Sequence, residues 1–264
     1  MKIHMNMEYK MTLGKIEKLY KRVETNAFGQ AVGVQLPEYL TMQLEQRDLS
    51  SDSLRLIHLS STYIQSQAFE HDLEQLWQVV SSEPSPACWT YLPYSGLESK
   101  QQLQQALSTQ FGFADCMHYL IQVNQQVVGW LALLNIRPQQ AVVEIGNVYF
   151  SHKMKRSRAA TETIFLLLDD CMKAKCRRVE WKCDDLNQPS KQAAVRFGFQ
   201  FEGLFRQDRV TKGRNRNTAW YSILDEEWGA LKPAYQAWLN ADNFDRQGQQ
   251  KIRLEDFKSL YSKD

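Results

Sequence analysis

The chain has 264 residues, of which 43% are hydrophobic and 23% are charged. This composition supplies enough apolar side chains for a packed core and excludes an intrinsically disordered protein. Lys and Arg number 32 against 30 Asp and Glu, which leaves a net charge of +2. Because so small a charge gives no bulk attraction for nucleic acid or a membrane surface, any anion site must be local.

Cysteine and histidine spacing argues against metal centres and disulfide frameworks. The five cysteines are odd in number and contain no C-x-x-C pair, which favours the reducing cytoplasm. The five histidines have no metal-ligand spacing, and Gln247 and Leu254 do not suit a calcium loop at 243–254. The longest apolar run, 127–136, is too short for a membrane helix. We therefore expect a cytoplasmic protein without a metal site.

Hydrophobic periodicity in the first half of the chain alternates between strand and helix patterns. Pro84 and Pro86 end the first helical pattern, and the polar residues 124–126 separate two β-rich runs. In chain order the pattern predicts a strand, two helices and a strand hairpin, at 53–59, 68–80, 99–110, 118–123 and 127–136.

The second half continues the alternation and ends in a hairpin. The expected elements are a strand, a helix, a strand, a short helix and two closing strands, at 141–150, 160–174, 178–183, 188–197, 199–210 and 218–224. Residues 228–239 have helical spacing, which we expect to break near Pro233. The order predicts a mixed α/β fold with a largely antiparallel sheet.

A basic loop separates the expected strand 141–150 from the helix 160–174. It carries Lys153, Lys155, Arg156 and Arg158. The free N–H groups and the dipole at a helix N-terminus favour an anion, so this arrangement predicts a phosphate-bearing ligand. A solvated basic loop and a nucleic-acid-binding patch are the alternatives.

The residues around this loop carry a family resemblance. Glu144-Ile-Gly146 precedes it, and Asn187-x-x-Ser190 and Arg196-Phe-Gly-Phe199 follow it. Together they resemble the GNAT superfamily of N-acetyltransferases, in the branch similar to ribosomal-protein N-terminal acetyltransferases. The resemblance implies an α/β (α+β) fold with a mixed, mostly antiparallel central sheet flanked by helices. The implied organisation is an N-terminal extension, an acetyltransferase domain and a helical tail packed on it, at 1–50, 51–225 and 226–264.

The resemblance also implies acetyl-CoA as co-substrate. The family pattern Gln/Arg-x-x-Gly-x-Gly/Ala, which holds the pyrophosphate, falls on Lys153 to Arg158, with Arg156 and Arg158 in place of the glycines. Arginine binds phosphate oxygens bidentately, so charge can replace close backbone approach, although a degenerate, non-binding loop is the alternative. The implied cofactor-binding residues are Val148, Phe150, Lys153, Lys155, Arg156, Ser157, Arg158, Ala159, Asn187 and Ser190.

In this family the acceptor amine attacks the thioester directly, which requires a proton acceptor and a stabilised thiolate. The tyrosine that many members carry seven residues after the asparagine is Ala194 here, so Ser190, or a water it holds, is the candidate acid. Glu144 is the candidate base, with an edge-facing or salt-bridged glutamate as the alternative. For Asn187 the alternative is a turn or a helix cap.

The acceptor side is implied by the resemblance alone. Trp89, Tyr91 and Tyr94 would form aromatic walls for an amine, and a hydrophobic plug is the alternative. The acceptor itself stays open between a protein N-terminus, a small amine and an antibiotic, as does the choice between monomer and homodimer. A catalytically silent acyl-CoA-binding sensor or interaction protein is the rival function. No nucleic-acid or membrane partner is expected.

Overall fold

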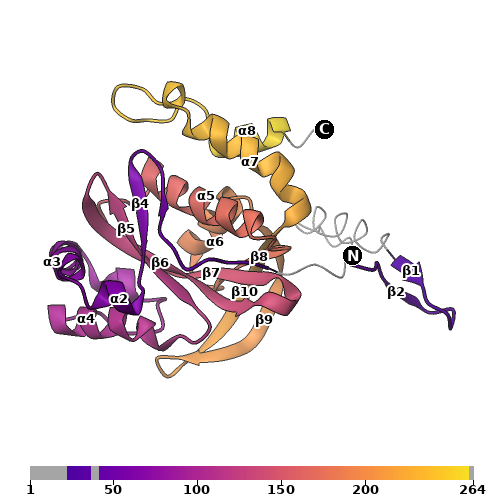
Figure 1. Cartoon of the computed structure of the whole chain (residues 1–264), viewed down its shortest axis with the longest axis horizontal. Helices are drawn as coiled ribbons and strands as arrows, with labels where there is room; N and C mark the ends of the chain where they lie inside the picture. The colour runs from indigo at the N-terminus through magenta and orange to yellow at the C-terminus, as the bar shows by residue number, and fades with distance from the viewer. Residues whose placement is uncertain (1–22, 37–41, 262–264) are drawn as a thin grey trace, which may run out of the picture.

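The structure, a computed structural model, describes residues 23–36 and 42–261. An eight-stranded sheet forms its centre, in the order β3-β4-β5-β6-β7-β8-β10-β9 (Figure 1). Neighbouring strands are antiparallel except for the parallel pair β7 and β8. The strands of this sheet are β3 (Leu49–Ser50), β4 (Leu54–His58), β5 (Met117–Val123), β6 (Gln126–Arg137), β7 (Val142–Phe150), β8 (Arg178–Asp184), β9 (Gln200–Thr211) and β10 (Arg214–Leu224). A separate two-stranded sheet holds β1 (Val23–Thr25) and β2 (Ala31–Gly33).

Helices cover both faces of the large sheet (Figure 1). One face carries α2 (Ser61–Ile64), α3 (Gln67–Ser81) and α4 (Lys100–Ser108). The other carries α5 (Arg158–Lys173) and α6 (Gln188–Arg196), with α7 (Asp225–Leu239) and α8 (Leu254–Tyr261) packed outside them. The short 3₁₀ turns are η1 (Pro86–Trp89), η2 (Gln110–Gly112), η3 (Pro138–Gln140) and η4 (Ala241–Asn243).

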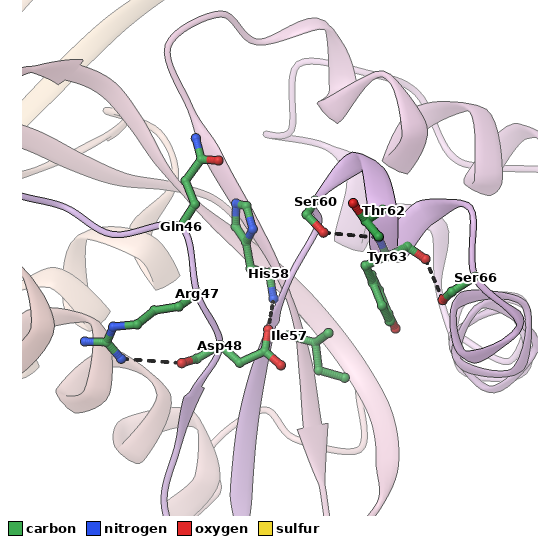
Figure 2. Close-up of a pocket in the computed structure, with 9 residues that line it drawn as sticks. All are labelled: Gln46, Arg47, Asp48, Ile57, His58, Ser60, Thr62, Tyr63 and Ser66. Carbon is green, nitrogen blue, oxygen red and sulfur yellow. Dashed lines mark hydrogen bonds between the residues drawn. The ribbon is translucent and has the colours of Figure 1, made fainter.

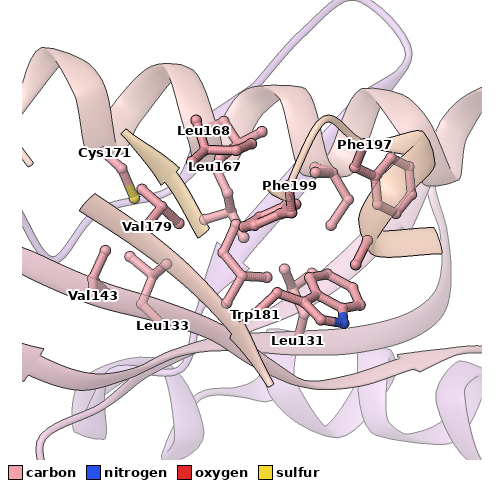
Figure 3. Packing of buried hydrophobic residues seen from close by; sticks show 14 of the residues in the cluster. Leu131, Leu133, Val143, Leu167, Leu168, Cys171, Val179, Trp181, Phe197 and Phe199 are labelled. Atoms are coloured by element: carbon pink, nitrogen blue, oxygen red, sulfur yellow. The ribbon is translucent and has the colours of Figure 1, made fainter. Parts of the chain in front are cut away.

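Two hydrophobic clusters hold these layers together. Between the sheet and α5, residues such as Val143, Leu167 and Val179 interdigitate, and Cys171 lies among them (Figure 3). Under α3 and α4 the second cluster is centred on Phe69 and Trp130, both fully buried. Since alternate residues of a strand point to opposite faces, β7 and β8 each contribute side chains to both sides of the sheet.

The predicted strands and helices of residues 53–224 are confirmed, with one shift. The second strand of the closing hairpin begins at Arg214 rather than at 218, because the turn needs only Lys212 and Gly213, both with positive φ.

The predicted break near Pro233 is wrong, because α7 runs through this residue. A proline inside a helix costs about 3 kcal/mol. Buried side chains on both sides of it, Trp228 before and Tyr235 and Trp238 after, offset that cost.

The body of the protein begins earlier than the expected boundary at residue 51. Met42 and Leu49 are buried in the main core, and β3 pairs with β4, so this part of the expected extension belongs to the sheet. Residues 1–22 and 37–41 of that extension lie outside the described residues. The C-terminal helices pack on α5, where Phe165 stacks against Tyr235 and Trp228. Within the described ranges, none of the helices is long and apolar enough to cross a membrane.

Candidate functional site

The parallel strands β7 and β8 pair over only three residues each, out of nine in β7 and seven in β8. Their register ends at Glu144 and Glu180, beyond which the strands separate. On its other side β7 stays paired with β6, through a register shift that leaves an extra residue at Asn147, where φ is +47°. The backbone N–H and C=O groups of β7 that face the gap therefore have no strand partner, and an extended ligand with amide groups can pair with them.

The basic loop lies where β7 leads into α5. Ser157 caps the helix by accepting a hydrogen bond from the amide of Ala160. The amides of Arg158 and Ala159 in the first turn have no acceptor within the helix. Arg156, at the first position where the family has glycine, has φ of +61°. The loop thus keeps a glycine-type backbone although the residue is arginine.

The four cations of this loop have different surroundings. Lys153 and Arg156 are exposed and make no hydrogen bond or ion pair to any residue that the structure describes. Lys155 Nζ lies 3.9 Å from Glu83 Oε2. Arg158 Nη2 instead donates to the carbonyl of Leu239 at 2.7 Å, and its guanidinium lies over the Phe244 ring. One cation is therefore an anchor for the C-terminal helices, and the others face solvent.

Val148 and Phe150, also expected at the cofactor, lie on β7 beside the gap. Both pack against the main hydrophobic cluster on the α5 side of the sheet. Their side chains are thus half-buried, and it is the backbone of this stretch that borders the gap.

The opposite rim of the gap is the start of α6. Asn187 is its N-cap, since Oδ1 accepts from the amide of Ser190 at 3.2 Å, which is the helix cap that the sequence left open. Ser190 Oγ accepts from Trp181 Nε1 at 3.0 Å. Burial raises the pKa of Cys183 nearby, against a smaller opposing effect of the Ser190 hydroxyl. The indole fixes Ser190 Oγ as an acceptor, so the hydroxyl hydrogen can point elsewhere.

Glu144 is the last residue of β7 that pairs with β8, and its side chain lies on the sheet face opposite α5. Its Oε2 is 2.9 Å from Lys182 Nζ and 2.6 Å from Asn135 Nδ2. Lys182 Nζ is also 2.9 Å from Glu180 Oε2 and 4.0 Å from the centre of the Trp220 ring. The structure thus gives Glu144 the salt-bridged surroundings that the sequence left open as the alternative to a general base.

Glu180 is the centre of this buried charge cluster. It forms ion pairs with Arg137, Arg178 and Lys182. Burial alone would raise the pKa of Glu180, but hydrogen bonds from the three cations outweigh it and lower the pKa to about 2. This cluster was not predicted from the sequence. The available signal was the alternation of charge at 178, 180 and 182, which places all three side chains on one face of a strand.

The aromatic segment after α3 is mostly buried. Trp89 stacks on Tyr149 with ring centres 5.0 Å apart, and Tyr94 donates its hydroxyl to Asn147 Oδ1 at 2.8 Å. Burial raises the pKa of Tyr94. Trp89 and Tyr94 therefore pack as the hydrophobic plug that was the alternative to aromatic walls for an amine. Tyr91 differs, because its hydroxyl reaches the carbonyl of Leu186 in the loop before α6.

A buried histidine contacts β7 at its register shift, next to Asn147. His118 Nε2 lies 2.9 Å from Asn147 Nδ2, and the His118 side chain is fully buried. Burial, with a smaller effect of His58, lowers the pKa of His118 to about 4. The ring is therefore neutral at physiological pH and accepts the amide hydrogen of Asn147. Nothing in the local sequence marked either residue, because the contact joins two strands.

A hollow of about 350 Å³ lies at the other edge of the sheet, between the start of β3 and α2 (Figure 2). Its polar side chains already have partners: Asp48 Oδ1 accepts from the amide of His58, and Ser60 caps α2. Burial is the main cause that lowers the pKa of His58. The hollow is remote from the gap, so it adds no group to the site. No cluster of three metal-ligating side chains occurs within residues 23–36 and 42–261.

Comparisons with known proteins match this chain to one family. The sequence model of the acetyltransferase (GNAT) family matches residues 72–199. A GCN5-related N-acetyltransferase from Brucella melitensis is 36% identical over 85% of this chain and all of its own, with a TM-score of 0.78. A probable acetyltransferase of the GNAT family from Chromobacterium violaceum is 31% identical over 75% of this chain and 98% of its own, with a TM-score of 0.66.

More distant structures share the fold. One is an acetyltransferase from Salmonella typhimurium that modifies the N-terminal serine of ribosomal protein L7/L12. It is 19% identical over 66% of this chain and 96% of its own, with a TM-score of 0.51. The comparison with curated proteins gives no match.

Proposed function

The chain belongs to the acetyltransferase (GNAT) family, whose co-substrate is acetyl-CoA, and from this we propose that it acetylates a primary amine, either a protein N-terminus or a small-molecule amine. The observation that carries the proposal is the gap between β7 and β8, which leads directly to the free amides and cations at the start of α5. Two open strand edges and a helix N-terminus suit a ligand with amides in its arm and phosphates at its end.

In the proposed complex the pyrophosphate lies against the amides of Arg158 and Ala159, with Lys153, Lys155 and Arg156 neutralising its charge. The positive φ of Arg156 supports this, because it keeps the backbone turn that glycine provides in relatives. Arg158 contributes its amide, since its guanidinium is bonded to Leu239. Asn187, through the Nδ2 group that its capping bond leaves free, would bind the amide-bearing arm.

The proposed reaction is a direct attack of the amine nitrogen on the thioester carbonyl carbon. The C–N bond forms, the C–S bond breaks, the amine loses a proton and the departing thiolate gains one. We propose that Ser190 donates a hydrogen bond to the sulfur, because Trp181 orients its oxygen and leaves the hydrogen available. Glu144 would accept the amine proton through a water, since Lys182 and Asn135 already bond its carboxylate directly.

The acceptor class stays broad in this proposal. The relative that modifies a ribosomal protein is too distant to transfer its substrate. A silent acyl-CoA-binding protein is the rival, and it predicts binding without turnover. We also propose a cytoplasmic location, which the five free cysteines support.

Calorimetric titration with acetyl-CoA, followed by an amine panel with CoA release as readout, tests the function. We expect micromolar-range binding and turnover of at least one amine. Ser190→Ala should then lower kcat by about 100-fold with an unchanged Kd for acetyl-CoA. Absence of binding by the folded protein would overturn the cofactor assignment, and binding without turnover across the panel would favour the silent rival.

A further inference from the structure

One arginine of β10 lies on the same sheet face as the buried charge cluster. Ala219, Tyr221 and Ile223 point into the main core on the α5 side. Because side chains alternate along a strand, Arg216 and the residues in step with it point to the opposite face. The hydrogen bond from Arg216 Nε to Thr218 Oγ1, at 3.2 Å, is consistent with this placement.

Arg216 differs from the cations of the charge cluster on this face in having no carboxylate partner. Arg137, Arg178 and Lys182 all form ion pairs with Glu180. Arg216 is half-buried and forms no ion pair with the residues that the structure describes. Burial is the largest cause that lowers the pKa of Arg216, followed by the charge of Arg209, while Asp184, Cys183 and Glu144 act in the opposite direction. A guanidinium in such a place is a cation that lacks a nearby anion.

The position of Arg216 relates it to the acceptor side of the gap. The segment containing Trp89 and Tyr91 is bonded at two points: Lys212 Nζ donates to the carbonyl of Trp89 at 2.6 Å, and the Tyr91 hydroxyl donates to the carbonyl of Leu186 at 3.1 Å. Arg216, in β10, follows Lys212 by four residues in the chain. Thr218, its neighbour on this face, pairs with the end of β8, two residues before Leu186. Arg216 therefore lies between the two attachment points, near the carboxyl end of β8.

We propose that Arg216 binds an anionic group, a carboxylate or a phosphate, carried by the acceptor amine. This inference rests on the proposed acetyl transfer and makes the acceptor more specific: an amine with a negative charge close to it. The planar fork of guanidinium N–H groups suits both anions, and binding would supply the charge that the protein itself does not place there. The anion can come from a small molecule or from an acidic side chain of a peptide.

The test compares matched acceptors in steady-state assays with the full chain. One arm uses phenylalanine against phenethylamine, which differ in the α-carboxylate. A second arm uses a peptide with Glu at its second position against the same peptide with Gln, and a third uses phosphoethanolamine against ethanolamine. We expect the anionic member of at least one pair to have a kcat/KM roughly 10- to 100-fold higher, and the arm that responds identifies the source of the anion.

Arg216→Gln should remove this preference while leaving kcat/KM for the neutral acceptor and the Kd for acetyl-CoA unchanged. Arg206→Gln makes the same charge change at an exposed position of the hairpin and should keep the preference. Arg216→Lys, which keeps the charge without the fork, should retain part of it. Unchanged acetyl-CoA binding also shows that each variant is folded.

Equal rates for anionic and neutral acceptors in every pair would overturn the assignment of Arg216 but leave acetyl transfer intact. An equal loss in Arg206→Gln would overturn it too, because bulk charge would then explain the preference. Acetyl-CoA binding with no turnover of any amine would overturn the proposed function, and this inference with it.

Discussion

The two faces of the sheet hold the β7–β8 gap by different means. Towards α5, backbone conformation positions the elements beside the gap. Gly129 lets the Tyr149 carbonyl approach β6, Arg156 adopts a left-handed turn and Ser157 caps the helix. On the opposite face, ion pairs between side chains position these strands, chiefly those of Lys182 with Glu144 and Glu180. The left-handed turn accepts an arginine side chain at a positive φ, whereas the close approach at Gly129 leaves no room for even a Cβ atom. A buried ion network is instead sensitive to the loss of any member.

The largest expected loss of stability comes from disturbing the close backbone approach at Gly129. In Gly129→Ala the added Cβ would lie 2.3 Å from the Tyr149 carbonyl oxygen, so β6 and β7 must move apart. We expect a loss of more than about 4 kcal/mol of unfolding free energy, measured by chemical denaturation. Gly203→Ala, with no atom within 4 Å of its new Cβ, is the control and should lose less than about 1 kcal/mol. Similar losses in both variants would contradict this reading.

The next largest loss of stability is expected from removing a cation of the buried charge cluster. Lys182→Met removes the cation shared by Glu144 and Glu180, both almost fully buried. Glu180 keeps Arg137 and Arg178, but Glu144 loses its cation. The uncompensated buried carboxylate of Glu144 should lower the unfolding free energy by at least about 3 kcal/mol. Lys191→Met removes the cation of the more exposed Lys191–Asp185 pair and should cost less than about 1 kcal/mol. If both variants unfold at the same denaturant concentration, the buried cluster has no special role.

The pH dependence of the unfolding free energy tests the same charge cluster. The pKa of Glu180 is about 2 in the folded chain against 4.5 for a free glutamate, so the folded state favours the ionised form. Its contribution, up to about 3 kcal/mol, is therefore complete above about pH 5 and is lost as pH falls towards 2. Denaturation curves between pH 2 and 6 should show a steeper loss for the native chain than for Glu180→Gln. Parallel curves would refute the assignment.

The smallest expected effect concerns the loop. Arg156→Gly removes an L-residue from φ of +61°, so it should raise the unfolding free energy by up to about 1 kcal/mol. The lost charge should at the same time weaken acetyl-CoA binding roughly 3- to 10-fold. Lys153→Gly removes a charge from the same loop at a residue without positive φ, and should weaken binding without stabilising the chain. A destabilised Arg156→Gly would show that the turn does not depend on backbone conformation.

Local patterns in the sequence were sufficient for most of the fold. The strands and helices between residues 53 and 224 follow from periodicity, and the position of the basic loop before a helix follows from the charge pattern. Asn187 and Ser190 were singled out by the family resemblance, and their roles stay predictions. Each of these features depends on residues close together in the chain.

Contacts between distant strands were not accessible in the same way. The pairing of Glu144 with Lys182, and of Asn147 with His118, depends on sheet order and on the irregular register of β7. The orientation of a strand side chain reverses with a single inserted residue, so no pattern within β7 could fix which face Glu144 occupies. The continuity of α7 through Pro233 likewise depends on tertiary packing on either side of the proline.

The bonds from the C-terminal helices to the rim of the gap have a consequence for biosynthesis. Arg158 at the start of α5 needs the carbonyl of Leu239, and the carbonyls of Val195 and Arg196 at the end of α6 accept from Lys258. Because the ribosome makes the chain from its N-terminus, α5 and α6 emerge well before these partners. A nascent chain therefore forms these hydrogen bonds only after residues 239 and 258 have left the exit tunnel, so α5 and α6 fold before α7 and α8 can pack against their ends.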